Sequence, residues 1–280
     1  MATVKPAAGA SQEPIPAREF EAETYARSHD EVGVTAADIL GHLSPCENEE
    51  IAALEERLKQ VEETAVTYMR DGAYEDERGM LHERIINAIL SDEAISAATP
   101  PDGEKPTFII LGGRGGSGKS WFANQVYDPK KCIVLDADEI KQRLPEYAGW
   151  NAAQVHTESG QIFERIVAIA LALGVNVVLD KTMKAPDSAL ADIRAFKAAG
   201  YRTEAHYMHL PRRLAAERAV KRFFLGASKR YVPVAVILAN TTNENTFDRV
   251  RRVVDRWSFR DNNVRRGAAP ILISETDARA

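Results

Sequence analysis

The chain has 280 residues, of which 45% are hydrophobic and 28% are charged, and its formal net charge at pH 7 is −5. This composition is typical of a globular enzyme and excludes a fibrous or intrinsically disordered chain. The acidic balance argues against a general nucleic-acid-binding surface, because phosphate backbones need concentrated positive charge. Only Cys46 and Cys132 are cysteines, and no apolar run has the length of a signal sequence or membrane span, so we expect a cytoplasmic protein without a membrane partner.

The N-terminal third predicts a tail followed by helices. Residues 1–45 begin with Ala, Pro, Gly and Ser without periodicity, and we expect them to be a largely mobile tail. Over 47–70 apolar residues recur every three or four positions, which predicts a helix with one apolar stripe, and a second helix is expected at 77–90. Residues 46–98 are therefore interpreted as a helical appendage. Its stripe is too short to favour a coiled-coil dimer.

A stretch of turn formers and charges at 98–106 marks a domain boundary. Beyond it, apolar β-rich runs alternate with helical stretches, which predicts an α/β domain over 105–280 with a P-loop NTPase or kinase-type parallel sheet flanked by helices. The expected strands are 107–112, 132–136, 175–180, 202–208 and 270–274. The expected helices are 118–127, 152–173, 186–199, 211–225 and 233–257.

A glycine-rich loop follows the first strand of this domain and matches the pattern G-x-x-x-x-G-K-[ST]. Backbone amides in such a loop, with the start of the next helix, surround phosphate oxygens. The lysine would reach the β- and γ-phosphates of ATP, and the final serine offers a hydroxyl to Mg²⁺. The nucleotide-binding residues are predicted to be Gly113, Arg114, Gly115, Gly116, Ser117, Gly118, Lys119 and Ser120, with Ser120 as the metal ligand.

Two further strands end on carboxylates, at the edge where open α/β sheets bind ligands. The first ends at Asp136 and Asp138; Asp136 either faces the ligand or caps the following helix, and Asp138 is the better candidate for the general base. The second ends at Asp180, followed by Thr182 and Lys184, and the acceptor pocket is expected there. For Asp180 three roles stay open: acceptor binding, water-mediated contact with Mg²⁺, or capping of a turn.

The segment from Pro211 to Pro233 is rich in arginine and predicts a lid whose cations close over the phosphates, with Arg222 and Arg230 as the candidates. A solvated helix face is the alternative for either residue. A second basic cluster, which runs from Arg249 to Arg266, is interleaved with aspartates and apolar residues, and we interpret it as a surface helix with local ion pairs. The histidines show no metal-ligand spacing.

Taken together, the glycine loop, Leu-Asp136-Ala-Asp138, the segment from Asp180 to Lys184, and the two arginines resemble the zeta toxin family of P-loop kinases over roughly residues 105–275. The resemblance implies phosphorylation of a hydroxyl of UDP-N-acetylglucosamine with ATP and Mg²⁺. It also implies the toxic half of a toxin–antitoxin pair, so an antitoxin or another inhibitory partner is expected.

By the same resemblance, Lys119 and Ser120 belong to the phosphate loop and Asp138 is the base. Lys184 would contact the acceptor, and Arg222 and Arg230 would be the lid arginines. The family usually carries Glu-Gly-Thr after the third strand, where this sequence has Asp180-Lys181-Thr182. That departure is expected to change both reach and charge in the acceptor pocket.

Two other functions stay open from the sequence. One is a kinase of another nucleotide acceptor, NAD-like or a polynucleotide end, for which salt-sensitive oligonucleotide binding would be the sign. The other is a nucleotide-dependent switch or assembly protein, which would bind ATP without making a phosphorylated product. The N-terminal helices lie outside the resemblance, and one hypothesis is that they cover the site as a built-in inhibitor.

Overall fold

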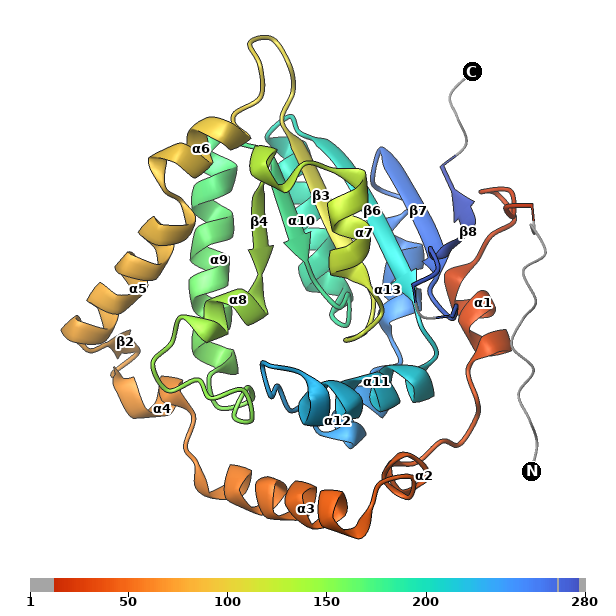
Figure 1. The fold of residues 1–280 in the computed structure, drawn as a ribbon. Coiled ribbons are helices and arrows are strands. Elements are labelled where there is room, and N and C mark those ends of the chain that lie inside the picture. Colours follow the sequence, from red (N-terminus) through yellow and green to blue (C-terminus); the bar gives the residue numbers. More distant parts are fainter. Residues whose placement is uncertain (1–12, 266, 277–280) are drawn as a thin grey trace.

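The computed structural model describes residues 13–265 and 267–276 and shows a central sheet flanked by helices (Figure 1). In this part of the chain the sheet has six strands in the order β4-β5-β3-β6-β7-β8. The first five are mutually parallel, and β8 runs antiparallel to β7. The strands are β3 (Thr107–Gly112), β4 (Ile133–Asp136), β5 (Val177–Asp180), β6 (Arg202–His209), β7 (Arg256–Asp261) and β8 (Ile271–Glu275).

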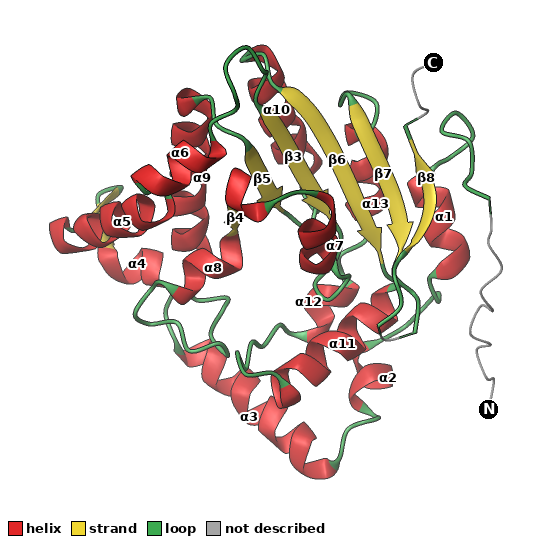
Figure 2. Ribbon diagram, turned by 45° about the horizontal axis from the view of Figure 1, so that its top comes forward, coloured by secondary structure: helices red, strands yellow, loops and turns green. Residues whose placement is uncertain are grey.

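Helices cover both faces of the sheet, because both faces of β3 are apolar. Phe108 and Ile110 belong to the cluster that includes Phe196 of α10 (Pro186–Ala198). Ile109 and Leu111 point the other way, to Phe122 of α7 (Lys119–Val126). Figure 2 shows α7 on one face and α10 with α13 (Asn243–Val250) on the other. The predicted α/β architecture with a mostly parallel sheet is confirmed.

The other helices of the sheet domain connect the strands around it. They are η1 (Pro129–Lys131), α8 (Ala137–Gln142), α9 (His156–Leu173), α11 (Arg212–Leu225) and α12 (Val234–Leu238). None of the helices in the described ranges has the length and apolar character needed to cross a bilayer.

The start of the described chain is packed on the sheet, in contrast to the mobile tail expected for residues 1–45. The Ile15 amide donates to the Ile273 carbonyl of β8 at 2.7 Å, and Phe20 is 1% exposed. The Phe20 ring lies on Trp257 and Phe259 of β7, with centroids 5.9 and 4.9 Å apart. This aromatic anchor gives residues 13–45 a place in the core, whereas residues 1–12 lie outside the described residues.

The N-terminal helices form a belt that starts at α1 beside β8, follows the lower edge with α2 and α3, and continues up the other side with α4, α5 and α6 (Figure 1). The helix expected over 47–70 breaks at Val61–Glu63, where three consecutive residues are exposed. Ile85 and Ile86 share one core with the sheet, so residues 46–98 are continuous with the main domain. The belt consists of α1 (Ala22–His29), α2 (Ala36–Leu40), α3 (Pro45–Gln60), α4 (Thr64–Tyr68), the hairpin β1 (Met69–Arg70) and β2 (Ala73–Tyr74), α5 (Asp76–Ile89) and α6 (Asp92–Ala98).

The helix expected over 233–257 is wrong in its second half. The structure has α12, α13 and then strand β7, so the interpretation of the basic cluster as one surface helix is also wrong. Trp257 and Phe259 alternate with Ser258 and Arg260, which is the period of a strand, and both aromatic rings are buried. The apolar valines just before Trp257 had suggested a continued helical stripe.

Candidate active site

The glycine-rich loop joins β3 to α7 in a conformation that depends on its glycines. Gly113 has a φ of 132° and Gly118 a φ of 90°, both in the region that favours glycine. A Cβ on Gly113 would also collide with the Met208 carbonyl of β6. Arg218 of α11 donates to the Gly116 carbonyl at 3.1 Å, and Asn262 donates to the Ser117 carbonyl at 2.8 Å. The loop is therefore held from outside as well as by its own turn.

Arg114 lies in the loop, but its side chain points into the protein and is 1% exposed. Its guanidinium forms a two-pronged pair with Glu244 of α13, with Nη2 to Oε2 at 2.8 Å. Burial would raise the pKa of Glu244, but hydrogen bonding from His209 and the charge of Arg114 bring it down to about 2. The Arg114 side chain thus fixes the loop to α13, and only its backbone is free to line a phosphate site.

Lys119 folds back over the loop. Its ammonium donates to the carbonyls of Gly113 at 2.9 Å and Arg114 at 3.3 Å, and lies 3.5 Å from Oδ1 of Asp180. Asp180 reaches this position because β5 pairs with β3 in a register that puts it beside Leu111, just ahead of the loop. The sequence motif and the end of β5 are thereby joined into one charged centre.

The carboxylates of β4 and β5 are neighbours, as Asp136 and Asp180 are register partners. The Asp138 amide donates to Oδ1 of Asp136 at 2.8 Å, so Asp136 caps α8, one of the two roles considered for it. Burial, together with the charges of Asp180 and Asp138, raises the pKa of Asp136 to about 6. Burial also raises the pKa of Asp180, against the opposing charge of Lys119. Both carboxyl groups therefore bind a proton more tightly than a carboxyl group in water.

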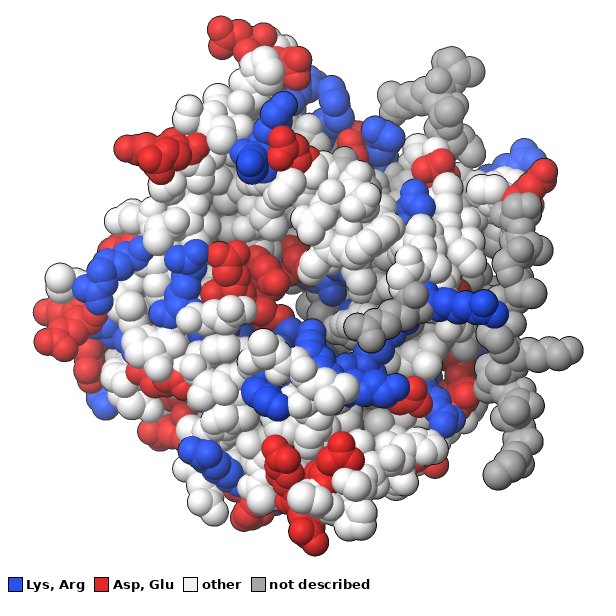
Figure 3. All heavy atoms as spheres, in the orientation of Figure 1, with Lys and Arg blue, Asp and Glu red and all other residues white. Residues whose placement is uncertain are grey.

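Two cations contact Asp138, one from its own helix α8 and one from the segment after α11. Arg230 forms an ion pair with Oδ2 of Asp138, and Lys141 lies 3.4 Å from Oδ1 of the same residue. Within the described chain, Nε and Nη2 of Arg222 are buried and have no hydrogen-bond partner. Burial, then the nearby charge of Arg230, lowers the pKa of Arg222. In Figure 3 acidic side chains gather above a central hollow, over β4 and α8, and basic side chains gather below it, over α11.

The residues after Asp180 divide between the site and the interior. Thr182 and Lys184 lie in an exposed loop and bond through their carbonyls, which accept from Gly113 and from Thr242 at 2.7 Å. Lys181 turns away: its ammonium pairs with Asp192 of α10 and lies over the Phe163 ring of α9. The charge expected in the acceptor pocket from this lysine is thus neutralised at α10.

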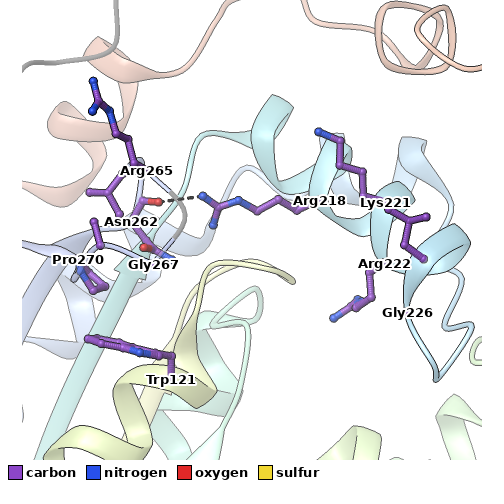
Figure 4. Close-up of a pocket in the computed structure, with 12 residues that line it drawn as sticks. Trp121, Arg218, Lys221, Arg222, Gly226, Asn262, Arg265, Gly267 and Pro270 are labelled. Atoms are coloured by element: carbon purple, nitrogen blue, oxygen red, sulfur yellow. Dashed lines mark hydrogen bonds between the residues drawn. The ribbon is translucent and has the colours of Figure 1, made fainter.

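A cavity of about 660 Å³ opens between α7, α11 and the segment after β7 (Figure 4). The sequence does not predict this cavity, because half of its lining residues follow β7, a strand that the sequence does not predict. The exposed tryptophan directly after Ser120 was the available signal. Its lining combines apolar and basic groups, including Trp121, Arg218, Lys221, Arg222, Leu225 and Arg265.

A glycine loop between a buried parallel strand and a helix, with its lysine beside the carboxylate that ends the neighbouring strand β5, defines a P-loop protein of the kinase type. Residues 91–265 match the model of the family described as zeta toxin, and the chain belongs to this family.

Two curated relatives, toxin zeta of Enterococcus hirae and toxin zeta of Streptococcus pyogenes, are each 28% identical over 118 residues. These residues are 39% of this chain and 41% of each relative, so the match spans less than half of the relatives' length.

Solved structures share the fold. A complex of AvrRxo1-ORF1 with AvrRxo1-ORF2 and sulphate ions matches with a TM-score of 0.62 and 18% identity, over 77% of both chains. The same complex with ATP gives 0.60 and 17%, over 77% of both chains. The PezAT chromosomal toxin–antitoxin system of Streptococcus pneumoniae gives 0.52 and 15%, over 74% of this chain and 84% of that one. At these identities the likeness concerns the fold alone.

Proposed function

We propose that this protein is an ATP- and Mg²⁺-dependent kinase that transfers the γ-phosphoryl group to a hydroxyl of a nucleotide sugar such as UDP-N-acetylglucosamine. One arrangement of charges carries the proposal: Lys119 pairs with Asp180, and the nearby Asp138 pairs with Arg230. Arg222 lies within the electrostatic reach of Arg230 and Asp138, and its Nε and Nη2 are buried without a hydrogen-bond partner in the described chain. Acids that can hold a metal and an acceptor, facing cations that can hold phosphate, are the parts phosphoryl transfer needs.

The donor nucleotide is proposed to span the loop. Its phosphates would lie along the backbone amides of 113–118 and the α7 N-terminus, with Lys119 at the β- and γ-phosphates. Its nucleoside would enter the cavity beside Trp121, which is 48% exposed and free to stack on a base. The fold shared with a complex that contains ATP agrees with this donor.

The residues present fit Mg²⁺. The ion prefers oxygen ligands, few of them from protein, and the exposed Ser120 hydroxyl with Asp180 and Asp136 offers such a set. When bound, Mg²⁺ would neutralise charge that builds up on the phosphoryl oxygens.

The protein's own groups would then carry the transfer. Asp138 is proposed to orient the acceptor hydroxyl and to take its proton as the oxygen bonds to the γ-phosphorus. The bond to the β–γ bridging oxygen breaks, and ADP leaves with that oxygen. Arg222 and Arg230 would stabilise the negative charge of the transition state. Because Arg230 pairs with Asp138 in this structure, it has to share or leave that carboxylate when the acceptor enters.

Thr182 and Lys184 are proposed to bind the acceptor, since both residues are exposed in the loop that directly follows the end of β5. We also propose an antitoxin as partner, because the curated relatives are toxins and one similar structure is a toxin–antitoxin system.

The test is mass spectrometry after incubation with Mg-ATP and separate acceptors: UDP-sugars, NAD, nucleosides and oligonucleotides. The wild type is expected to yield a phosphorylated UDP-sugar, and Asp138→Asn none. Glu139→Gln is the matched control, because Glu139 is the next residue but pairs with Arg143 at the surface. Product on another acceptor would correct the substrate. If ATP is bound or hydrolysed to ADP but no acceptor is phosphorylated, the result would refute the kinase and favour a nucleotide-dependent switch or assembly protein.

A further inference from the structure

Each of the two site arginines is followed by a buried aromatic residue. Arg222 precedes Phe223, which is 6% exposed, and Arg230 precedes Tyr231, which is 3% exposed. The two rings pack edge to face with centroids 5.3 Å apart. Both belong to one small cluster with Ile51 of α3, itself 2% exposed. The residues that follow the two arginines therefore pack on the same helix, α3 of the N-terminal belt.

A hydrogen bond also joins the segment of Arg230 to α3. The Tyr231 hydroxyl donates to Oε1 of Glu55 on α3 at 2.5 Å. Burial and the bond to Glu55 raise the pKa of Tyr231, so the phenol stays a neutral donor at all ordinary pH values. The backbone of Tyr231 is held too, since its amide donates to the Gly149 carbonyl at 3.3 Å.

The segment around Gly149 completes the support. Gly149 has a φ of 78°, and a Cβ there would collide with the Ser228 carbonyl and approach that of Lys229 to 2.9 Å, so this loop and the lid loop are in backbone contact. The next residue, Trp150, lies under the guanidinium of Arg57 on α3, with 4.0 Å from Cζ to the ring centroid. Helix α3 therefore contacts the lid directly and through the 148–151 loop.

We propose that α3 is a positioning element that holds Arg222 and Arg230 over the phosphoryl-transfer site, and that Glu55 and Ile51 are its principal positioning residues. The inference rests on the proposed function. It predicts the opposite effect on turnover from a built-in inhibitor. Because α3 packs on the side chains next to the arginines, loosening α3 should lower turnover, whereas loosening an inhibitor would raise it. Fixed cations cost no reorganisation when charge develops, and small misplacements of such groups are costly.

Steady-state kinetics test the role. For Glu55→Ala and Ile51→Ala we expect kcat to fall on the order of 10- to 100-fold, with the KM for ATP changed about twofold or less. Glu55→Gln keeps an oxygen that accepts from Tyr231 and should recover most of the loss. Glu56→Ala is the matched control, because Glu56 is exposed and pairs with Lys59 of its own helix.

Coupling separates positioning from general damage. In an Arg230→Ala background, Glu55→Ala should cost less than one third of its effect in the wild type, because the group it positions is gone. Full additivity, with each substitution acting as if alone, would overturn the proposal. So would a wild-type kcat in both Glu55→Ala and Ile51→Ala.

A measurement that does not depend on catalysis distinguishes the positioning role of α3 from the proposed kinase function. Trypsin cleaves after Lys229 and Arg230, and cleavage there should become several-fold faster in Glu55→Ala and Ile51→Ala at a temperature where circular dichroism shows both to be folded. Faster cleavage with unchanged kcat refutes positioning but leaves the kinase. If the wild type makes no phosphorylated product, the proposed function fails and the inference fails with it, whatever the cleavage rate.

Discussion

The ionised form of Asp136, at the end of β4, is predicted to destabilise the fold. Asp136 is crowded by Asp180 and Asp138 and is partly withdrawn from water, and these causes raise its pKa from the ordinary value of 3.8 to about 6. A raised pKa means that the folded protein binds the proton more tightly than the unfolded chain. The stability contributed by protonated Asp136 is therefore complete below pH 4 and is lost as the pH rises through about 6.

The replacement Asp136→Asn should remove this loss. Asparagine keeps an oxygen for the Asp138 amide, so the cap of α8 survives. The difference between 3.8 and about 6 corresponds to about 3 kcal/mol, which makes the variant more stable by at most that amount at pH 8 and by about half of it at pH 5. Activity should fall, because the replacement removes one of the carboxylates that are proposed to hold Mg²⁺.

Urea unfolding at pH 5 and pH 8, with EDTA to remove divalent cations, measures both values. Glu139→Gln, whose partner Arg143 is at the surface, should show no comparable pH dependence. Asp180→Asn should gain less than Asp136→Asn, because it also removes the carboxylate beside Lys119. A stability difference for Asp136→Asn that stays constant between the two pH values, or that decreases toward pH 8, would refute the reasoning about crowded carboxylates.

Three further substitutions separate the parts of the site. Lys119→Ala should lower phosphoryl transfer at least 100-fold while unfolding stays cooperative, as judged by product formation and thermal unfolding. Trp121→Ala should weaken ATP binding roughly 5- to 100-fold but leave tripolyphosphate binding unchanged in calorimetry, with Trp121→Phe close to wild type; equal losses for both ligands would exclude stacking. Arg114→Met should cost about 3–5 kcal/mol in urea unfolding, because Glu244 is left buried without its cation, and a loss below 1 kcal/mol would contradict the structural role.

The sheet domain could be predicted because its signals are local. The glycine loop, the strand before it and the helix after it are specified by adjacent residues, and the strands that end at Asp136 and Asp180 are short apolar runs with a carboxylate at the end. That both acids lie at one edge of the sheet follows from parallel pairing, which the alternation of strands and helices indicates, whereas the strand order that makes them neighbours comes from the structure. Strand β7 could not be recognised, because the valines before Trp257 fit a helical period equally well.

The site contacts that sequence could not provide are those between distant segments. Nothing near Arg218 indicates that it would hold the glycine loop, and nothing near Arg114 indicates a partner 130 residues later. The role of Lys181 was misjudged for a related reason. Its position after Asp180 suggested a charge in the pocket, but alternation along the backbone sends its side chain toward Asp192, and the sequence gives no sign of that pair.

The residues that match the family model are fewer than the residues that fold together as one unit. Residues 91–265 leave out β8 and everything before α6, yet Phe20 fills the core beside β7, and the Asp248 carboxylate accepts from the amides of Ala22 and Glu23 at 2.9 Å. The amide and guanidinium of Arg212 at the start of α11 both donate to Asp30 at 3.0 Å. A fragment trimmed to the match would expose the aromatic face of β7 and free α11, the helix that carries Arg222. The N-terminal belt is therefore part of the structure that shapes the site, and variants of single residues test its role more cleanly than truncation.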